Sequence, residues 1–187
     1  MNKNIVFVIG GCRSGKSSYA LDQANQVEVD HNPAEPTLKK SKYFIATSVP
    51  MDTEMEDRVI KHKLERGDDW QTIEEPANID KAIVEYSPMA SVILVDCLTL
   101  WVSNLLFQSD DQAQMDLAIQ NLEQALLQCE CPVFLVSNEV GYGIVPENKL
   151  ARQFRDIAGS VNQRMAKIAD KVVVIMAGID VQIKPKP

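Results

Sequence analysis

The sequence predicts a single α/β domain, residues 1–187, in which helices cover both faces of a mostly parallel β-sheet. Short apolar runs of strand length alternate with segments of helical periodicity along the chain. These runs are continuously apolar and do not alternate with polar residues, which is typical of parallel strands buried on both faces. In such a sheet, right-handed crossovers place ligand-binding loops at the carboxyl ends of the strands.

The elements follow from local patterns taken in chain order. The apolar runs predict strands over residues 5–9, 43–46, 71–74, 92–95 and 133–136. Apolar residues at helical spacing predict helices over residues 17–26, 52–66, 78–86, 115–129 and 154–168, with a further helix that ends at Phe107. Asp52 or Thr53 is expected to cap the second helix, Gly67 to end it, and Asn78 to cap the third. Apolar runs at 172–175 and 181–184 flank Gly178, so a C-terminal hairpin is expected.

Composition excludes several classes of protein. The chain has 19 Lys and Arg against 26 Asp and Glu, a net charge of −7, which disfavours binding along nucleic acid. No apolar run approaches the roughly 20 residues of a membrane span. The N-terminus lacks the pattern of a secretory signal, so a cytoplasmic protein is expected. In that compartment the four cysteines, Cys12, Cys97, Cys129 and Cys131, are expected to be reduced thiols.

A glycine-rich loop connects the first expected strand to the first expected helix. Residues 10–17 read Gly-Gly-Cys-Arg-Ser-Gly-Lys-Ser, a full match to the G-x-x-x-x-G-K-[ST] pattern of a phosphate-binding loop. Its glycines let backbone N–H groups turn toward phosphate oxygens, and the helix N-terminus adds partial positive charge. The fold is therefore expected to be P-loop NTPase-like. The candidate nucleotide-binding residues here are Gly10, Gly11, Cys12, Arg13, Ser14, Gly15, Lys16 and Ser17.

Two residues of this loop and one from another strand have more specific expected roles. Lys16 is expected to act on the β- and γ-phosphates during catalysis, and the Ser17 hydroxyl to bind Mg²⁺. Asp96 directly follows the apolar run at 92–95, where P-loop enzymes place a carboxylate that holds the same Mg²⁺. The alternative for Asp96 is an ordinary solvated aspartate at a strand end. Together the three residues predict chemistry on a magnesium–nucleoside triphosphate.

His62 allows two interpretations from the residues alone. Met55 and Val59 share its side of the expected helix, which favours a histidine at the edge of the core. Arg58 and Arg66, each four residues away, favour the neutral imidazole and attract polyphosphate. A neutral imidazole beside a phosphate can act as a general base or a nucleophile.

Several stretches together resemble a known family. They are residues 10–17, 43–48 (Tyr-Phe-Ile-Ala-Thr-Ser), Glu54-Met55 with Arg58 and His62, and 137–148 (Ser-Asn-Glu-Val-Gly-Tyr-Gly-Ile-Val-Pro-Glu-Asn), continuing through Arg152, 154–156, Gly159 and 162–163. Over nearly its whole length the chain resembles the bifunctional adenosylcobinamide kinase/adenosylcobinamide-phosphate guanylyltransferase of cobalamin biosynthesis.

The resemblance implies two reactions. A nucleoside triphosphate, ATP or GTP, phosphorylates the hydroxyl of the aminopropanol arm of adenosylcobinamide. GTP then guanylylates adenosylcobinamide phosphate through a covalent GMP–histidine, giving adenosylcobinamide-GDP and pyrophosphate. His62 occupies the position of that histidine. The resemblance also implies a homotrimer. Beyond the phosphate loop, the family's nucleotide contacts correspond to Ala46, Thr47, Ser48, Lys63, Leu64, Glu65, Arg66, Glu74 and Asp96.

Two alternatives to the bifunctional enzyme are a small-molecule kinase without guanylyl transfer and a nucleotide-binding switch that hydrolyses slowly. A GTP switch usually carries Asn-Lys-x-Asp, whereas Ala151 stands at the Asp position after Asn148-Lys149. The polar residues of the long match also have two interpretations: solvated charges on a capped helix, or corrinoid binding and subunit contact. These residues are Glu139, Asn148, Arg152, Arg155 and Asp156.

Overall fold

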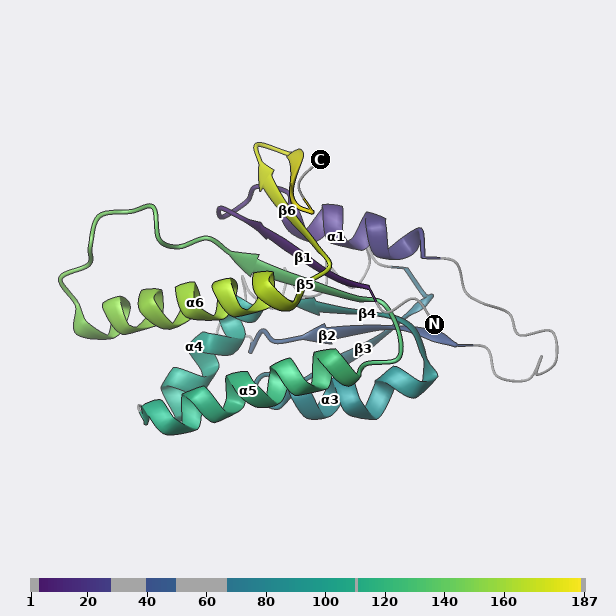
Figure 1. Cartoon of the computed structure of the whole chain (residues 1–187), viewed down its shortest axis with the longest axis horizontal. Helices are drawn as coiled ribbons and strands as arrows, with labels where there is room; N and C mark the ends of the chain where they lie inside the picture. Colours follow the sequence, from purple (N-terminus) through teal and green to yellow (C-terminus); the bar gives the residue numbers. More distant parts are fainter. Residues whose placement is uncertain (1–3, 28–39, 50–66, 110, 186–187) are drawn as a thin grey trace.

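A computed structural model describes residues 4–27, 40–49, 67–109 and 111–185 (Figure 1). Their strands form one seven-stranded sheet in the order β3-β2-β4-β5-β1-β6-β7. Six strands pair in parallel, and β7 pairs antiparallel with β6. The strands are β1 (Ile5–Gly10), β2 (Ser41–Ala46), β3 (Trp70–Glu74), β4 (Ala90–Asp96), β5 (Val133–Asn138), β6 (Lys171–Met176) and β7 (Ile179–Lys184).

Helices cover both faces of this sheet, as the continuously apolar strands predict. On one face α1 (Lys16–Asn25) packs through Ala20 and Ala24 against β-strand side chains such as Val8 and Val136 (Figure 1). A larger core cluster lies on the other face, beneath the remaining helices. They are α3 (Ile79–Tyr86), α4 (Leu98–Gln108), α5 (Gln112–Gln128) and α6 (Lys149–Ile168), with a short 3₁₀ turn at Ser87–Met89. The α/β fold class is thus confirmed.

Two local features refine the sequence predictions. Helix α6 begins at Lys149, five residues before the first apolar residue of its predicted stripe, because the Asn148 side chain accepts a hydrogen bond from Ala151 N at 3.1 Å. The C-terminal hairpin is confirmed, with both turn residues, Ala177 and Gly178, at positive φ (52° and 80°). The helix expected over residues 52–66 lies outside the described residues.

The carboxyl ends of the parallel strands meet at one edge of the sheet. In the strand registers, Gly10 pairs with Asn138, and Ala46 pairs with both Asp96 and Glu74. The order of residues along this edge is therefore Glu74, Ala46, Asp96, Asn138 and Gly10. Neighbouring strands are about 4.8 Å apart, so the edge from β3 to β1 spans about 19 Å.

The structure also bears on two expectations from composition, which concern membrane spans and the state of the cysteines. None of the helices in the described part of the chain combines the length and the apolar character that crossing a membrane requires. The four cysteines are unpaired, as predicted: Cys12 is exposed in the phosphate loop, while Cys97, Cys129 and Cys131 are buried.

Candidate nucleotide-binding site

The phosphate loop between β1 and α1 has a conformation that its glycines make possible. Gly15 has a φ of +97°, a left-handed conformation that L side chains rarely adopt. A Cβ on Gly10 would lie only 2.5 Å from the Ile175 carbonyl oxygen and 2.6 Å from Ser14 Oγ. The loop is braced by the C-terminal hairpin, because Gly178 N donates to the Ser14 carbonyl oxygen at 2.9 Å.

Lys16 is positioned to meet an anion in this loop. Its side chain is buried, and Nζ donates a hydrogen bond to the Gly11 carbonyl oxygen at 3.0 Å. The ammonium group therefore folds back across the loop at the N-terminus of α1, where the helix dipole also favours negative charge. A phosphate oxygen is a stronger acceptor for an ammonium group than a neutral carbonyl.

Ser17 and Asp96 supply the oxygen atoms that a magnesium ion prefers. Ser17 is the second residue of α1 and half-buried, and Asp96 is the half-buried last residue of β4. Hydroxyl and carboxylate oxygens are the hard ligands typical of Mg²⁺ sites that also use nucleotide phosphates. The chemistry of these two residues thus fits the ion.

Thr47 organises the segment that carries Asp96. Its side chain is fully buried, and its hydroxyl donates to the Cys97 carbonyl oxygen and accepts from Cys97 N, both at 2.8 Å. Thr47 N also donates to the Asp96 carbonyl oxygen at 3.3 Å. Both hydrogen-bonding functions of the hydroxyl are therefore used within the protein. Burial, followed by the charge of Asp96, raises the pKa of the Cys97 thiol to about 11, so this thiol stays protonated at neutral pH.

Asn104 of α4 connects two segments of the same edge and was missed in the sequence. Its Nδ2 donates to the Thr47 carbonyl oxygen at 2.8 Å and to the Pro76 carbonyl oxygen at 2.9 Å. These bonds join the segments that follow β2 and β3.

Two other predicted nucleotide contacts also lie at this edge. Glu74 is the last residue of β3, is exposed, and lies four strand spacings from β1, while Ser48 is half-buried.

A second group missed in the sequence lies beneath the edge, at the end of β5. Ser137 Oγ donates to Asn162 Oδ1 of α6 at 2.7 Å and lies 3.2 Å from Thr99 Oγ1 of α4. Thr99 Oγ1 accepts from Asn138 N at 2.7 Å, and Asn162 Nδ2 donates to the Asn138 carbonyl oxygen at 3.1 Å. Thr99, Ser137 and Asn162 are all buried. The end of β5 is thus fixed by side chains from two helices.

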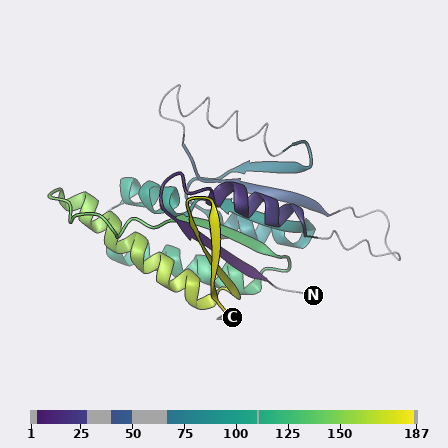
Figure 2. The same cartoon turned by 90° about the horizontal axis from the view of Figure 1, so that it is seen from above.

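Arg152 and Arg155 of α6 both bind the backbone of the segment 139–148. Arg152 Nη1 donates to the Pro146 and Glu147 carbonyl oxygens, and Arg155 donates to those of Ile144 and Gly141, over 2.6–2.9 Å. Both guanidinium groups hold the backbone of this segment in place. The segment and the first turns of α6 project beyond the strands (Figures 1 and 2), with the Tyr142 and Ile144 side chains about 95% exposed.

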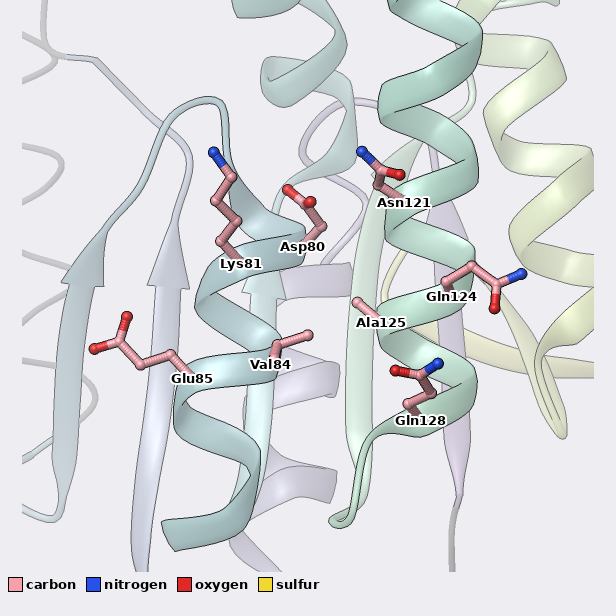
Figure 3. A pocket seen from close by; sticks show the side chains of 8 residues that line it. All are labelled: Asp80, Lys81, Val84, Glu85, Asn121, Gln124, Ala125 and Gln128. Carbon is pink, nitrogen blue, oxygen red and sulfur yellow. The ribbon is translucent and has the colours of Figure 1, made fainter.

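Two cavities lie away from the predicted nucleotide-binding residues. One of about 350 Å³ lies between α3 and α5, where Val84 points toward Ala125 (Figure 3). Another of about 250 Å³ lies between α4 and the start of α6, lined by Phe107, Leu150 and Phe154 among others. Neither contains a residue of the predicted nucleotide site. His62, with Lys63, Leu64, Glu65 and Arg66, lies outside the described residues.

Comparison with known proteins identifies the family. Residues 6–183 match the family model described as cobinamide kinase / cobinamide phosphate guanyltransferase. The chain belongs to this family. It is 42% identical to the bifunctional adenosylcobalamin biosynthesis protein CobU of Salmonella typhimurium, over 96% of this chain and 99% of that protein.

Two further relatives of this chain are also named bifunctional adenosylcobalamin biosynthesis proteins. The Escherichia coli CobU protein is 38% identical, over 96% of this chain and 99% of that protein. The Pseudomonas aeruginosa CobP protein is 36% identical, over 96% and 97% respectively. Among solved structures, a KaiC-like protein of Pyrococcus horikoshii aligns with a TM-score of 0.45 at 12% identity, covering 92% of this chain and 70% of that one. The matched range 6–183 contains every residue of the predicted nucleotide site.

Proposed function

We propose that this chain phosphorylates the hydroxyl of adenosylcobinamide and then transfers GMP from GTP to the product. The observation that carries the proposal is the match of residues 6–183 to a two-function family, in a chain whose phosphate loop has buried Lys16 turned across it. A kinase that lacks guanylyl transfer would need only the loop and its metal ligands. The match over nearly the whole chain favours the bifunctional enzyme.

In the kinase step the substrate hydroxyl oxygen attacks the γ-phosphorus, the bond between that phosphorus and the bridging oxygen to the β-phosphate breaks, the nucleoside diphosphate leaves, and the hydroxyl proton passes to solvent. Loop N–H groups and Lys16 hold the phosphates and stabilise the charge that develops on them. Mg²⁺, bound by Ser17 and Asp96, would supply further neutralisation of the triphosphate. Thr47 fixes the segment of Asp96 through its two hydrogen bonds to Cys97.

In the guanylyl step His62 is the proposed nucleophile. Its imidazole attacks the α-phosphorus of GTP, and pyrophosphate leaves. A phosphate oxygen of adenosylcobinamide phosphate then attacks the same phosphorus, which releases His62 and gives adenosylcobinamide-GDP. Beyond the phosphate loop and Asp96, the proposed nucleotide contacts are Ala46, Thr47, Ser48, Lys63, Leu64, Glu65, Arg66 and Glu74.

The decisive experiment is incubation with α-labelled GTP and Mg²⁺, followed by intact-protein mass measurement. The parent protein is expected to gain the mass of one GMP in an acid-labile, base-stable bond. His62→Ala should form no adduct and no adenosylcobinamide-GDP, while kinase activity persists because γ-phosphoryl transfer needs no covalent carrier. His31→Ala is the matched control and should form the adduct normally.

The outcomes separate the candidate functions. Kinase activity in a parent protein that forms no adduct would support the kinase without guanylyl transfer. An adduct on His62→Ala would assign the nucleophile to another residue. We also propose that the enzyme is a homotrimer, which light scattering on the eluting protein would test directly.

A further inference from the structure

Two buried side-chain oxygens at the carboxyl edge stand out from the rest of the described chain. They are Ser14 Oγ and Asn138 Oδ1, and within the described residues they are the buried side-chain polar atoms that have no hydrogen-bond partner. Buried polar groups are nearly always paired, and an unpaired one costs on the order of 1–3 kcal/mol. Two such atoms together indicate a place where a bound ligand completes the hydrogen bonding.

The register of β1 and β5, together with the Cβ direction of Gly10, places both side chains on the same face of the sheet, around Gly10. Val8 and Val136, two residues before Gly10 and Asn138, belong to the core cluster beneath α1. Because side chains alternate along a strand, Asn138 faces the same side as Val136, which is the side of α1. The Cβ direction of Gly10 points at Ser14 Oγ, and Gly10 pairs with Asn138 on the neighbouring strand.

The backbone that carries the Asn138 side chain is held on both sides. Thr99 Oγ1 accepts from Asn138 N, and Asn162 Nδ2 donates to its carbonyl oxygen. The next amide, Glu139 N, donates to the Gly10 carbonyl oxygen at 3.0 Å, which ties this residue directly to the phosphate loop. The side chain is thus presented from a fixed position, although its own oxygen contacts no protein donor.

We propose that Asn138 is a further substrate-contacting residue, whose side-chain amide donates a hydrogen bond to the terminal phosphate of the nucleotide. Strand β5 lies between β1, which leads into the phosphate loop, and β4, which ends in Asp96. A group between the loop and the proposed metal ligand faces the end of the triphosphate. Phosphate oxygens only accept hydrogen bonds, so Asn138 must present its Nδ2 donor to them. A half-turn of the amide exchanges Nδ2 and Oδ1, and it breaks no hydrogen bond at Oδ1 because no protein group donates to that oxygen. The inference rests on the proposed kinase function.

Thermal unfolding tests this contact independently of activity. Asn138→Ala should not lower the Tm of the nucleotide-free protein, because Oδ1 forms no hydrogen bond there and the substitution removes an unpaired buried atom. A ligand that binds the native state raises Tm according to its affinity. The variant should therefore lose most of the extra Tm increase that a non-hydrolysable triphosphate gives over the diphosphate, while the diphosphate increase persists. Asn138→Asp should show a larger loss, because its carboxylate repels the phosphate.

Kinase kinetics supply the second measurement. Loss of one preorganised donor lowers kcat by about 100-fold, so Asn138→Ala should show this decrease with a nearly constant KM for cobinamide. Asn121→Ala removes an exposed amide on α5 and should match the parent in both assays.

Every outcome has a defined meaning. A lower Tm of nucleotide-free Asn138→Ala would assign the amide a structural role and overturn the proposal. Parental kcat, or a parental difference between triphosphate and diphosphate, would also overturn it. If the parent itself lacks kinase activity, the proposed function fails, and the thermal measurement still decides whether Asn138 contacts the terminal phosphate.

Discussion

Replacing Gly10 with alanine tests whether the close approach of the phosphate loop to β6 is required for stability. The added Cβ would lie 2.5 Å from the Ile175 carbonyl oxygen, whereas ordinary contacts begin at 3.4 Å. The backbone must therefore yield by about 0.9 Å, the difference between these two distances. Gly10 and Ile175 are register partners in the β1–β6 pair, so this movement strains the ladder between two central strands. The Ser14 hydroxyl, 2.6 Å away, can instead rotate.

The expected cost follows from the size of this clash. Overpacking a well-packed interior by a single carbon costs about 1–3 kcal/mol. For a chain of this length each kcal/mol lowers Tm by about 2–4 °C, so Gly10→Ala should lower Tm by about 2–12 °C. Gly11→Ala is the matched control, because a Cβ there meets no atom within 4 Å.

Calorimetry or circular dichroism on both variants without nucleotide provides the measurement. Gly11→Ala should unfold within about 2 °C of the parent, on the scale of surface substitutions. Equal Tm values for Gly10→Ala and the parent would refute the reasoning, because the loop would then accommodate a Cβ at Gly10 without strain despite the 2.5 Å contact with the Ile175 carbonyl oxygen.

Two further predictions concern catalysis. Lys16→Ala should lower kinase kcat by at least about 100-fold, because it removes the charge that stabilises the transferring phosphate; near-parental turnover in the folded variant would contradict this role. Asp96→Asn should keep the fold and raise the Mg²⁺ concentration needed for half-maximal activity in both reactions, whereas overlapping Mg²⁺ titrations would leave Asp96 as a strand-end carboxylate.

The sequence predicted those features that depend on local pattern. Continuous apolar runs such as 92–95 predicted parallel strands buried on both faces, because only that environment removes the need for polar alternation. The phosphate-binding pattern predicted the loop, since its spacing couples a strand end to a helix start. Once those strands are parallel, Gly10, Ala46, Glu74 and Asp96 must reach the same edge.

The features that the sequence could not provide depend on contacts between distant residues. Thr47 was predicted as a nucleotide contact, yet its hydroxyl bonds to Cys97, 50 residues away. In the sequence, Arg152 and Arg155 are as compatible with solvated charges on a helix as with a binding role. The groups that they bind are backbone carbonyls, which every residue has, so no residue type in the sequence identifies these partners. Such partners become visible only when strand order and register are known.

The last prediction concerns Asn162, which forms a buried polar cluster with Thr99 and Ser137 at the end of β5. This buried residue of α6 accepts from Ser137 Oγ and donates to the Asn138 carbonyl oxygen. Asn162→Ala leaves that carbonyl without its α6 donor, at a cost of about 1–3 kcal/mol, and should lower Tm by about 2–12 °C. Gln163→Ala, on the exposed side of the same helix, also truncates an amide side chain to Ala and should leave Tm near the parental value.

The proposal for Asn138 gives Asn162 a second expected effect, because Asn162 binds the Asn138 carbonyl oxygen. If the amide of Asn138 binds the terminal phosphate, loosening its backbone should reduce kcat in proportion to the lost positioning, with a smaller effect than Asn138→Ala. Kinase assays well below the Tm of Asn162→Ala separate this effect from unfolding. A variant with lowered Tm and parental kcat would show that the hydrogen bonds from α6 stabilise the fold without positioning Asn138.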